Sequence, residues 1–213
     1  TDITKLEEQA ETIIAENAAD LIAGRQAGLS EALLDRLTLT EERISGIAKS
    51  VREVIALPDP LGRILETILR PNGLKIEKIS VPVGVIGVIY EARPNVTADS
   101  AALCLKSGNA VILRGGKEAI RSNKAIADTM RAAIAAAGLP ADCVCLVEDT
   151  DRETANQMMR LNGYIDLLIP RGGRGLIQSV VANSTVPVIE TGVGNCHAYV
   201  EKSGDIAMAA EIV

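Results

Sequence analysis

The spacing of apolar residues divides the chain into three parts, which predict different secondary structure. Up to about residue 57, apolar side chains recur near the period of one helix face, beginning with Leu6, Ala10, Ile13, Ile14 and Leu21. Ser30 is a suitable N-cap for a second helix, and the stretch from Thr38 to Glu41 resembles a capping box for a third. The pattern predicts a helical segment over residues 1–57.

Residues 58–81 follow a different pattern. Two alternating runs flank Pro71-Asn72-Gly73, which is a strong turn signal, so this stretch predicts a β-hairpin. A hairpin with an apolar face and an open edge commonly pairs with another chain or domain. We therefore expect an oligomer contact here.

From Val83 onward, short apolar runs alternate with amphipathic stretches. The runs predict strands at residues 84–90, 110–114, 144–147, 164–170 and 186–192, with helices at 97–108, 122–138, 151–161 and 175–184. Ser122 is the expected cap of the second of these helices. Strands that are apolar on both faces and separated by helices predict an α/β fold with a doubly wound parallel sheet over residues 82–213.

Each predicted strand ends in a polar loop. These loops are residues 91–95, 114–117, 148–151, 171–174 and 190–194. Parallel strands bring their carboxyl ends to one edge of the sheet, where ligands of such folds bind. Two loops, at 114–117 and 171–174, carry Gly-Gly beside cations, which suits a phosphate group. The alternative is that loops of this type are polar and rich in glycine in any such fold.

The chain carries neither of two common nucleotide-binding sequences. Gly84 and Gly87 lie inside a predicted strand, so the spacing of a dinucleotide fingerprint is not met, and no Walker A sequence is present. A nucleotide would have to be bound in another way.

Composition narrows the class of protein. The 213 residues include no Phe or Trp and only three Tyr, so the core must be aliphatic. A net charge of −6 argues against a nucleic-acid partner. No apolar run approaches the ~18 residues that a membrane span requires, so none is expected. Four cysteines without disulfide-framework spacing predict reduced thiols and a cytoplasmic protein.

Four long stretches resemble a known family. They begin at Pro82 (PVGVIGVIYEARPNVTADS), Leu105 (LKSGNAVILRGGKEAIRSN), Val147 (VEDTDRETANQMMRLNGYIDLLIPRGG) and Val186 (VPVIETGVGNCHAYV). Together they resemble the γ-glutamyl phosphate reductase family of the aldehyde dehydrogenase superfamily, whose cofactor domain is Rossmann-like. The resemblance implies NADPH-dependent reduction of γ-glutamyl 5-phosphate to glutamate 5-semialdehyde, with release of phosphate, in proline biosynthesis.

The resemblance also implies roles for particular residues. Asn95 matches the side-chain amide that donates to the oxyanion of the reaction intermediate, and Lys117 matches the cofactor lysine that favours a 2′-phosphate. The residues expected to bind the cofactor are Ala92, Arg93, Pro94, Lys117, Arg171, Gly172, Gly173, Glu190, Thr191 and Gly192. A base role for Glu190 is not required of a reductase, and Arg174 either adds phosphate affinity or lies on the surface.

The nucleophilic cysteine that the chemistry requires is expected beyond residue 213, in a segment that these residues do not contain. Its thiolate would attack the acyl phosphate, and hydride would reduce the thioester. Cys196, beside His197, is the alternative nucleophile, although adjacent residues on a strand point to opposite faces. Cys104, Cys143 and Cys145 are expected to be inert, and one Cys-Val-Cys pair offers too few ligands for a metal.

These expectations leave three functions open. The first is the reductase, with residues 1–213 as its cofactor-binding part, truncated before the catalytic domain and inactive alone. The second is a non-catalytic nucleotide-binding or assembly module. The third is a superfamily reductase acting on another acyl phosphate or aldehyde. The expected partners are γ-glutamyl phosphate, further copies of the chain, and through the resemblance a glutamate 5-kinase, with no nucleic acid or membrane.

Overall fold

A computed structural model describes residues 4–191 and 197–212. The chain begins with four helices: α1 (Thr4–Glu8), α2 (Ala10–Gln26), α3 (Glu31–Leu37) and α4 (Glu41–Ala56). Ser30 caps α3 as predicted, because its hydroxyl accepts a hydrogen bond from Leu33 N. The predicted capping box is wrong: Thr40 caps α4, and the Thr38 hydroxyl instead donates to the Leu34 carbonyl within the end of α3.

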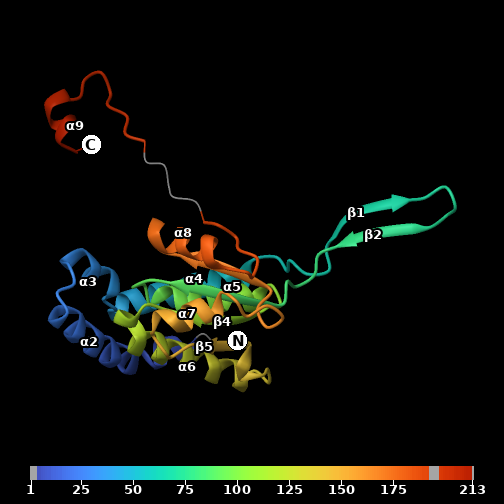
Figure 1. Cartoon of the computed structure of the whole chain (residues 1–213), viewed down its shortest axis with the longest axis horizontal. Coiled ribbons are helices and arrows are strands. Elements are labelled where there is room, and N and C mark those ends of the chain that lie inside the picture. Colours follow the sequence, from blue (N-terminus) through green and yellow to red (C-terminus); the bar gives the residue numbers. More distant parts are fainter. Residues whose placement is uncertain (1–3, 192–196, 213) are drawn as a thin grey trace.

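The hairpin prediction is confirmed. Strands β1 (Ile64–Leu69) and β2 (Lys75–Ile79) pair antiparallel around a turn in which Gly73 adopts a φ of +84°. The Asn72 side chain accepts from Leu74 N within that turn. Every residue of both strands is exposed, and the hairpin projects away from the body of the molecule (Figure 1).

The rest of the described chain builds a parallel sheet. Its strands are β3 (Val85–Tyr90), β4 (Ala110–Arg114), β5 (Val144–Leu146) and β6 (Leu167–Arg171), in the spatial order β5-β4-β3-β6. Between them run α5 (Asn95–Lys106), α6 (Ile120–Ala136) and α7 (Arg152–Met158), with α8 (Arg174–Asn183) after β6 and α9 (Ile206–Ile212) beyond the undescribed gap. Short 3₁₀ turns η1 (Lys117–Ala119) and η2 (Ala141–Cys143) precede α6 and β5.

Both faces of the sheet are covered, as the apolar strands predicted. On one face, Ile86, Val88 and Tyr90 of β3 pack against α5 and α6 and share one core with residues of α1, α2 and α4. On the other face, Ile89 and Leu168 pack with residues of α7 and α8. The amino-terminal helices thus contribute side chains to the core of the sheet itself.

The prediction of a fifth strand over residues 186–192 is wrong within its described part. A single parallel bridge joins Val188 to Leu168, with hydrogen bonds from Leu168 N to Pro187 O and from Ile189 N to Leu168 O. Pro187 has no N–H to continue a ladder. The Thr191 hydroxyl occupies the next acceptor, the Pro170 carbonyl, at 2.8 Å. Residue 192 lies outside the described residues.

The predicted cap of the central helix is also wrong. Helix α6 begins at Ile120, so Ser122 lies inside its first turn. The buried carboxylate of Asp20, on α2, accepts from Ser122 N at 2.8 Å, from Ser122 Oγ at 2.7 Å and from Arg121 N at 3.3 Å. A side chain about a hundred residues away therefore satisfies the first backbone donors of α6.

Candidate functional site: a polar rim at the carboxyl edge of the sheet

The order of the strands places a crevice between β3 and β6. The chain runs outward from β3 through β4 to β5 and then returns to place β6 on the other side of β3. The loop after β3 leads to α5 on one face, and the loop after β6 leads to α8 on the other. Ligands of open α/β sheets bind at such a reversal of strand order, beyond the carboxyl ends of the strands.

The first hollow lies at this crevice and encloses about 620 Å³. The loop after β3 supplies Glu91, Ala92 and Arg93, while Arg171, Gly172, Gly173 and Thr191 come from the β6 side; Leu33, Arg36, Val96, Glu118 and Ile177 complete the lining. Six predicted cofactor residues therefore meet in one hollow. Glu91 joins its two walls, because its Oε2 accepts a hydrogen bond from Gly173 N at 2.8 Å.

A second hollow of about 650 Å³ lies over the ends of β4 and β5. Lys117 lines it, together with Arg114 and the acidic loop at residues 149–152. Arg114 ties these loops together, since its Nη2 donates to the carbonyls of Thr150 at 2.7 Å and Asp151 at 3.0 Å. The Asp149 pKa is lowered by hydrogen bonds from Asp151 N and the Thr154 hydroxyl and by the Arg114 charge, which keeps this carboxylate ionised.

The loop that carries Lys117 is shaped by a glycine. A Cβ on Gly115 would lie 2.2 Å from Asn123 Nδ2 and 3.1 Å from the Tyr90 ring, so only glycine fits. Tyr90 and Asn123 are held by Thr97, whose hydroxyl lies 2.6 Å from Tyr90 OH and donates to Asn123 Oδ1. Burial raises the Tyr90 pKa far above its ordinary value, so this residue is a neutral structural support.

A third hollow, of about 520 Å³, contains Pro94 and Asn95. It shares Arg36 and Arg93 with the first hollow and is otherwise lined mainly by α3, α4 and the start of α5. Asn95 is the first residue of α5, and its Nδ2 donates to Asp99 Oδ2 at 3.0 Å. One N–H of the side-chain amide is thereby fixed, and the second is not engaged by Asp99.

Asp99 is a candidate that the sequence reading missed. Burial raises its pKa, while the hydrogen bond from Asn95 and the charge of Arg171 oppose that shift. The signal was present in the sequence, because Asp99 stands four residues after Asn95, the spacing that brings side chains together on a helix. Arg36 was likewise missed, whereas Glu91 and Arg114 were anticipated only as members of the loops at residues 91–95 and 114–117.

Other predicted residues lie elsewhere. Glu190 and Arg174 are exposed and line none of these three hollows, while Gly192 and Cys196 lie outside the described residues. His197 is exposed. Cys104 is buried in the core as expected, and burial raises its pKa to about 11, so its thiol stays protonated. Cys143 and Cys145 are free and partly buried.

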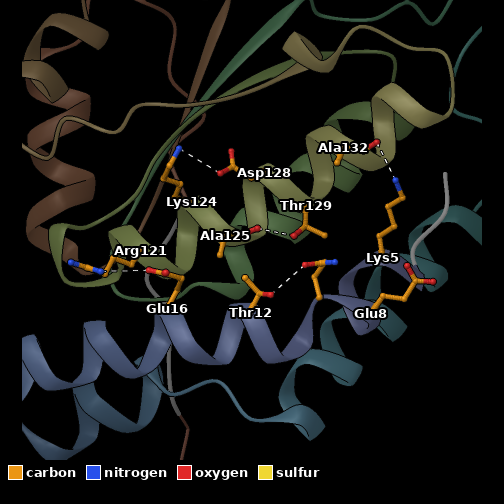
Figure 2. A pocket seen from close by; sticks show the side chains of 11 residues that line it. Lys5, Glu8, Thr12, Glu16, Arg121, Lys124, Ala125, Asp128, Thr129 and Ala132 are labelled. Atoms are coloured by element: carbon orange, nitrogen blue, oxygen red, sulfur yellow. Dashed lines mark hydrogen bonds and ion pairs between the residues drawn. The ribbon is translucent and has the colours of Figure 1, made fainter.

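A further hollow, of about 660 Å³ between α2 and α6, contains none of the predicted site residues (Figure 2). Its cationic side chains are engaged within the protein: Arg121 lies 3.6 Å from Glu16, and Lys124 lies 3.4 Å from Asp128. Lys5 Nζ reaches the Ala132 carbonyl at 3.5 Å. All three cations of this hollow therefore have partners within the protein, in contrast to Lys117 at the rim.

An open α/β sheet with cationic, glycine-rich loops at the reversal of strand order is typical of a dinucleotide-binding enzyme domain. The sequence matches the aldehyde dehydrogenase family over residues 4–213, and the chain belongs to this family. It is 59% identical to γ-glutamyl phosphate reductase of Moorella thermoacetica over 208 residues, and 58% identical to that of a Geobacillus species over 205 residues. These alignments cover 98% and 96% of this chain but 50% of each relative, so the chain spans about half their length.

Solved structures agree with this assignment. The γ-glutamyl phosphate reductase of Thermotoga maritima superimposes with a TM-score of 0.89 at 45% identity, over 99% of this chain and 51% of that one. An acetylating aldehyde dehydrogenase from Geobacillus thermoglucosidasius, at 19% identity and a TM-score of 0.68, shares the fold over 98% of this chain and 43% of that one. In the part of this chain that the structure describes, no helix is both long and apolar enough for a membrane span.

Proposed function

We propose that residues 1–213 are the cofactor-binding part of an NADPH-dependent γ-glutamyl phosphate reductase acting in proline biosynthesis in the cytoplasm. The observation that carries the proposal is the rim, where cationic and glycine-rich loops from separate strands surround two adjoining hollows at the strand-order reversal. Relatives of this name at about 58% identity support the substrate. Residues 82–213 would form the cofactor domain, with residues 1–57 as its helical segment and 58–81 as its hairpin.

The chemistry of the rim fits a dinucleotide phosphate. Gly173 N starts α8 with a backbone donor of the kind that binds phosphate, and the Arg171 side chain lies in the same hollow. Lys117, in the second hollow, would meet the 2′-phosphate that distinguishes NADPH from NADH. Ala92, Arg93, Pro94 and Thr191 would border the path of the cofactor, with Glu190 and Gly192 in the segment that follows.

The bound cofactor would supply a hydride, and the chain's own residues would position the acyl group. In this proposal the free N–H of the Asn95 amide donates to the oxygen on which negative charge develops. Asp99 would hold that amide in place through the 3.0 Å hydrogen bond. Arg36 and Arg93, which line both the Asn95 hollow and the crevice, supply positive charge where an acyl phosphate would lie.

Replacement of Lys117 by alanine should weaken NADPH binding about ten-fold or more, the loss expected for one charge-assisted contact of ~1.5–3 kcal/mol. Lys117 is exposed, and within the described residues no hydrogen bond or ion pair occupies its ammonium group. NADH binding should change little. Fluorescence titration with both cofactors measures these affinities.

The control for this substitution is Lys124→Ala, which removes a lysine whose Nζ is already paired with Glu148 at 2.7 Å. It should leave NADPH affinity unchanged. An unaltered affinity in the Lys117 variant would remove this lysine from the cofactor site, and absence of NADPH binding by the parent chain would refute the proposed function.

We further propose that the hairpin joins copies of the chain. Its apolar side chains are exposed, among them Ile64 at 59%, Leu65 at 60%, Ile68 at 40% and Ile76 at 44%, an arrangement that a partner chain would cover. Leu65→Lys should therefore convert an oligomer to a smaller species in size-exclusion chromatography. Gln178→Lys introduces the same charge at an exposed position on α8, away from the hairpin, and should leave the elution volume unchanged. Identical elution of parent and Leu65 variant would exclude the hairpin contact.

A further inference from the structure

The two hollows assigned to the cofactor meet at two carboxylates. Glu91 and Glu118 are the residues that line both hollows. A dinucleotide that extended from Lys117 to Arg171 would have to place its negatively charged diphosphate beside them. Negative charges beside a diphosphate are unfavourable, so these two acids should lower the affinity for the cofactor.

Glu91 also occupies a backbone N–H group that could otherwise donate a hydrogen bond to a phosphate. Its Oε2 accepts the hydrogen bond of Gly173 N at 2.8 Å, and Gly173 is the N-cap of the ten-residue helix α8. A Cβ on Gly172 would lie 2.7 Å from the carboxyl carbon of Glu91, so the side chain lies closely across this glycine pair. Backbone N–H groups at a helix start are the donors that bound phosphates use.

Glu118 is placed differently, although it carries the same charge at the same border. Its carboxylate lies over Gly116, where a Cβ would be 2.2 Å from its Oε1. It therefore lies against the Gly115-Gly116 pair, whereas the hydrogen bond from Gly173 N is accepted by Glu91. Comparing substitutions of the two residues therefore separates the effect of a nearby negative charge from the effect of occupying Gly173 N, the donor at the start of α8.

We propose that Glu91 is an internal competitor for the anionic part of the cofactor. Its carboxylate accepts the hydrogen bond of Gly173 N and must leave this donor before a diphosphate can take it. Glu91 thus lowers the affinity for the cofactor and favours its release. This inference rests on the proposed function, because it assumes that the cofactor crosses the border between the two hollows.

The test is Glu91→Gln, which keeps the length of the side chain and an acceptor oxygen but removes the charge. Because a bond to a neutral acceptor is roughly half as strong as one to a carboxylate, NADPH should bind this variant about three- to ten-fold more tightly. Glu118→Gln removes a charge at the same border without freeing Gly173 N, and its effect should stay below about two-fold. Fluorescence titration of the 213-residue chain measures all three affinities.

A second measurement does not depend on the nicotinamide cofactor. Inorganic pyrophosphate is titrated into ¹⁵N-labelled chain, and the Gly173 amide resonance is followed. Half-saturation should occur at about a three- to ten-fold lower concentration in Glu91→Gln than in the parent chain. Equal half-saturation, no response of Gly173 in either chain, or an equal gain in Glu118→Gln would overturn the inference. If pyrophosphate behaves as expected while no chain binds NADPH, the proposed function fails and the competition at Gly173 stands.

Discussion

Replacing Asp20 by alanine should lower the free energy of unfolding by about 3 kcal/mol, because three donors at the start of α6 lose their acceptor at once. Asp20 is 4% exposed, so water cannot readily replace its carboxylate. Its negative charge also lies at the positive end of the α6 dipole, which adds to the loss. Denaturant unfolding followed by circular dichroism measures the change.

The same substitution should also affect the proposed cofactor site. The loop with Gly115 and Lys117 leads directly into α6, so a frayed start of this helix displaces the loop. NADPH affinity should fall together with stability. Asp128→Ala removes an exposed acid from the same helix and should change stability by less than about 0.5 kcal/mol. A loss below about 1 kcal/mol in the Asp20 variant would show that Asp20 does not cap α6.

Gly87→Ala should destabilise the protein by about 2 kcal/mol, since the added methyl group has no room in the packed layer behind β3. It would lie 2.5 Å from Leu168 Cδ2, 2.8 Å from Met158 Cε and 3.3 Å from Ile165 Cγ2. All three neighbours are at most 2% exposed, so they cannot swing into solvent to make space. Unfolding of the variant by heat or denaturant measures the loss.

Gly46→Ala is the matched control, because the chemical change is identical and the surroundings are open. Gly46 lies in α4 with no neighbouring atom within 4 Å of the added group. Alanine is favoured over glycine inside a helix by about 0.5–1 kcal/mol, so this variant should be more stable than the parent. Equal effects of the two substitutions would contradict the packing described for Gly87.

How far the sequence predicts the fold depends on the range of the interactions involved. The hairpin and the Ser30 cap follow from a few neighbouring residues, and both are confirmed. The layered sheet follows from runs of apolar residues that cannot face water. The start of α6 could not be predicted in this way, because its cap comes from Asp20 on another helix.

In the candidate site too, some features could be predicted from local sequence and others depend on contacts between distant residues. Loops that end parallel strands must share one edge, so the gathering of Arg93, Lys117, Arg171 and the Gly172-Gly173 pair could be anticipated. Which side chains face the hollows could not. Glu91 was noted in its loop, but its bond to Gly173 N depends on how β3 and β6 lie beside each other. The predicted fifth strand failed because Pro187 has no N–H for one ladder bond and the Thr191 hydroxyl takes the acceptor of another, the Pro170 carbonyl.

The base of the hairpin has a practical consequence for dissecting this molecule. Gly62 N donates to Ser80 O at 2.9 Å and Ser80 N to Arg63 O at 3.0 Å, so the two chain segments leave the body side by side. Everything between them is solvent-exposed. A short turn could therefore bridge residues 62 and 80 without disturbing the packed layers, which would allow the proposed self-association and the proposed nucleotide binding to be tested separately on one polypeptide.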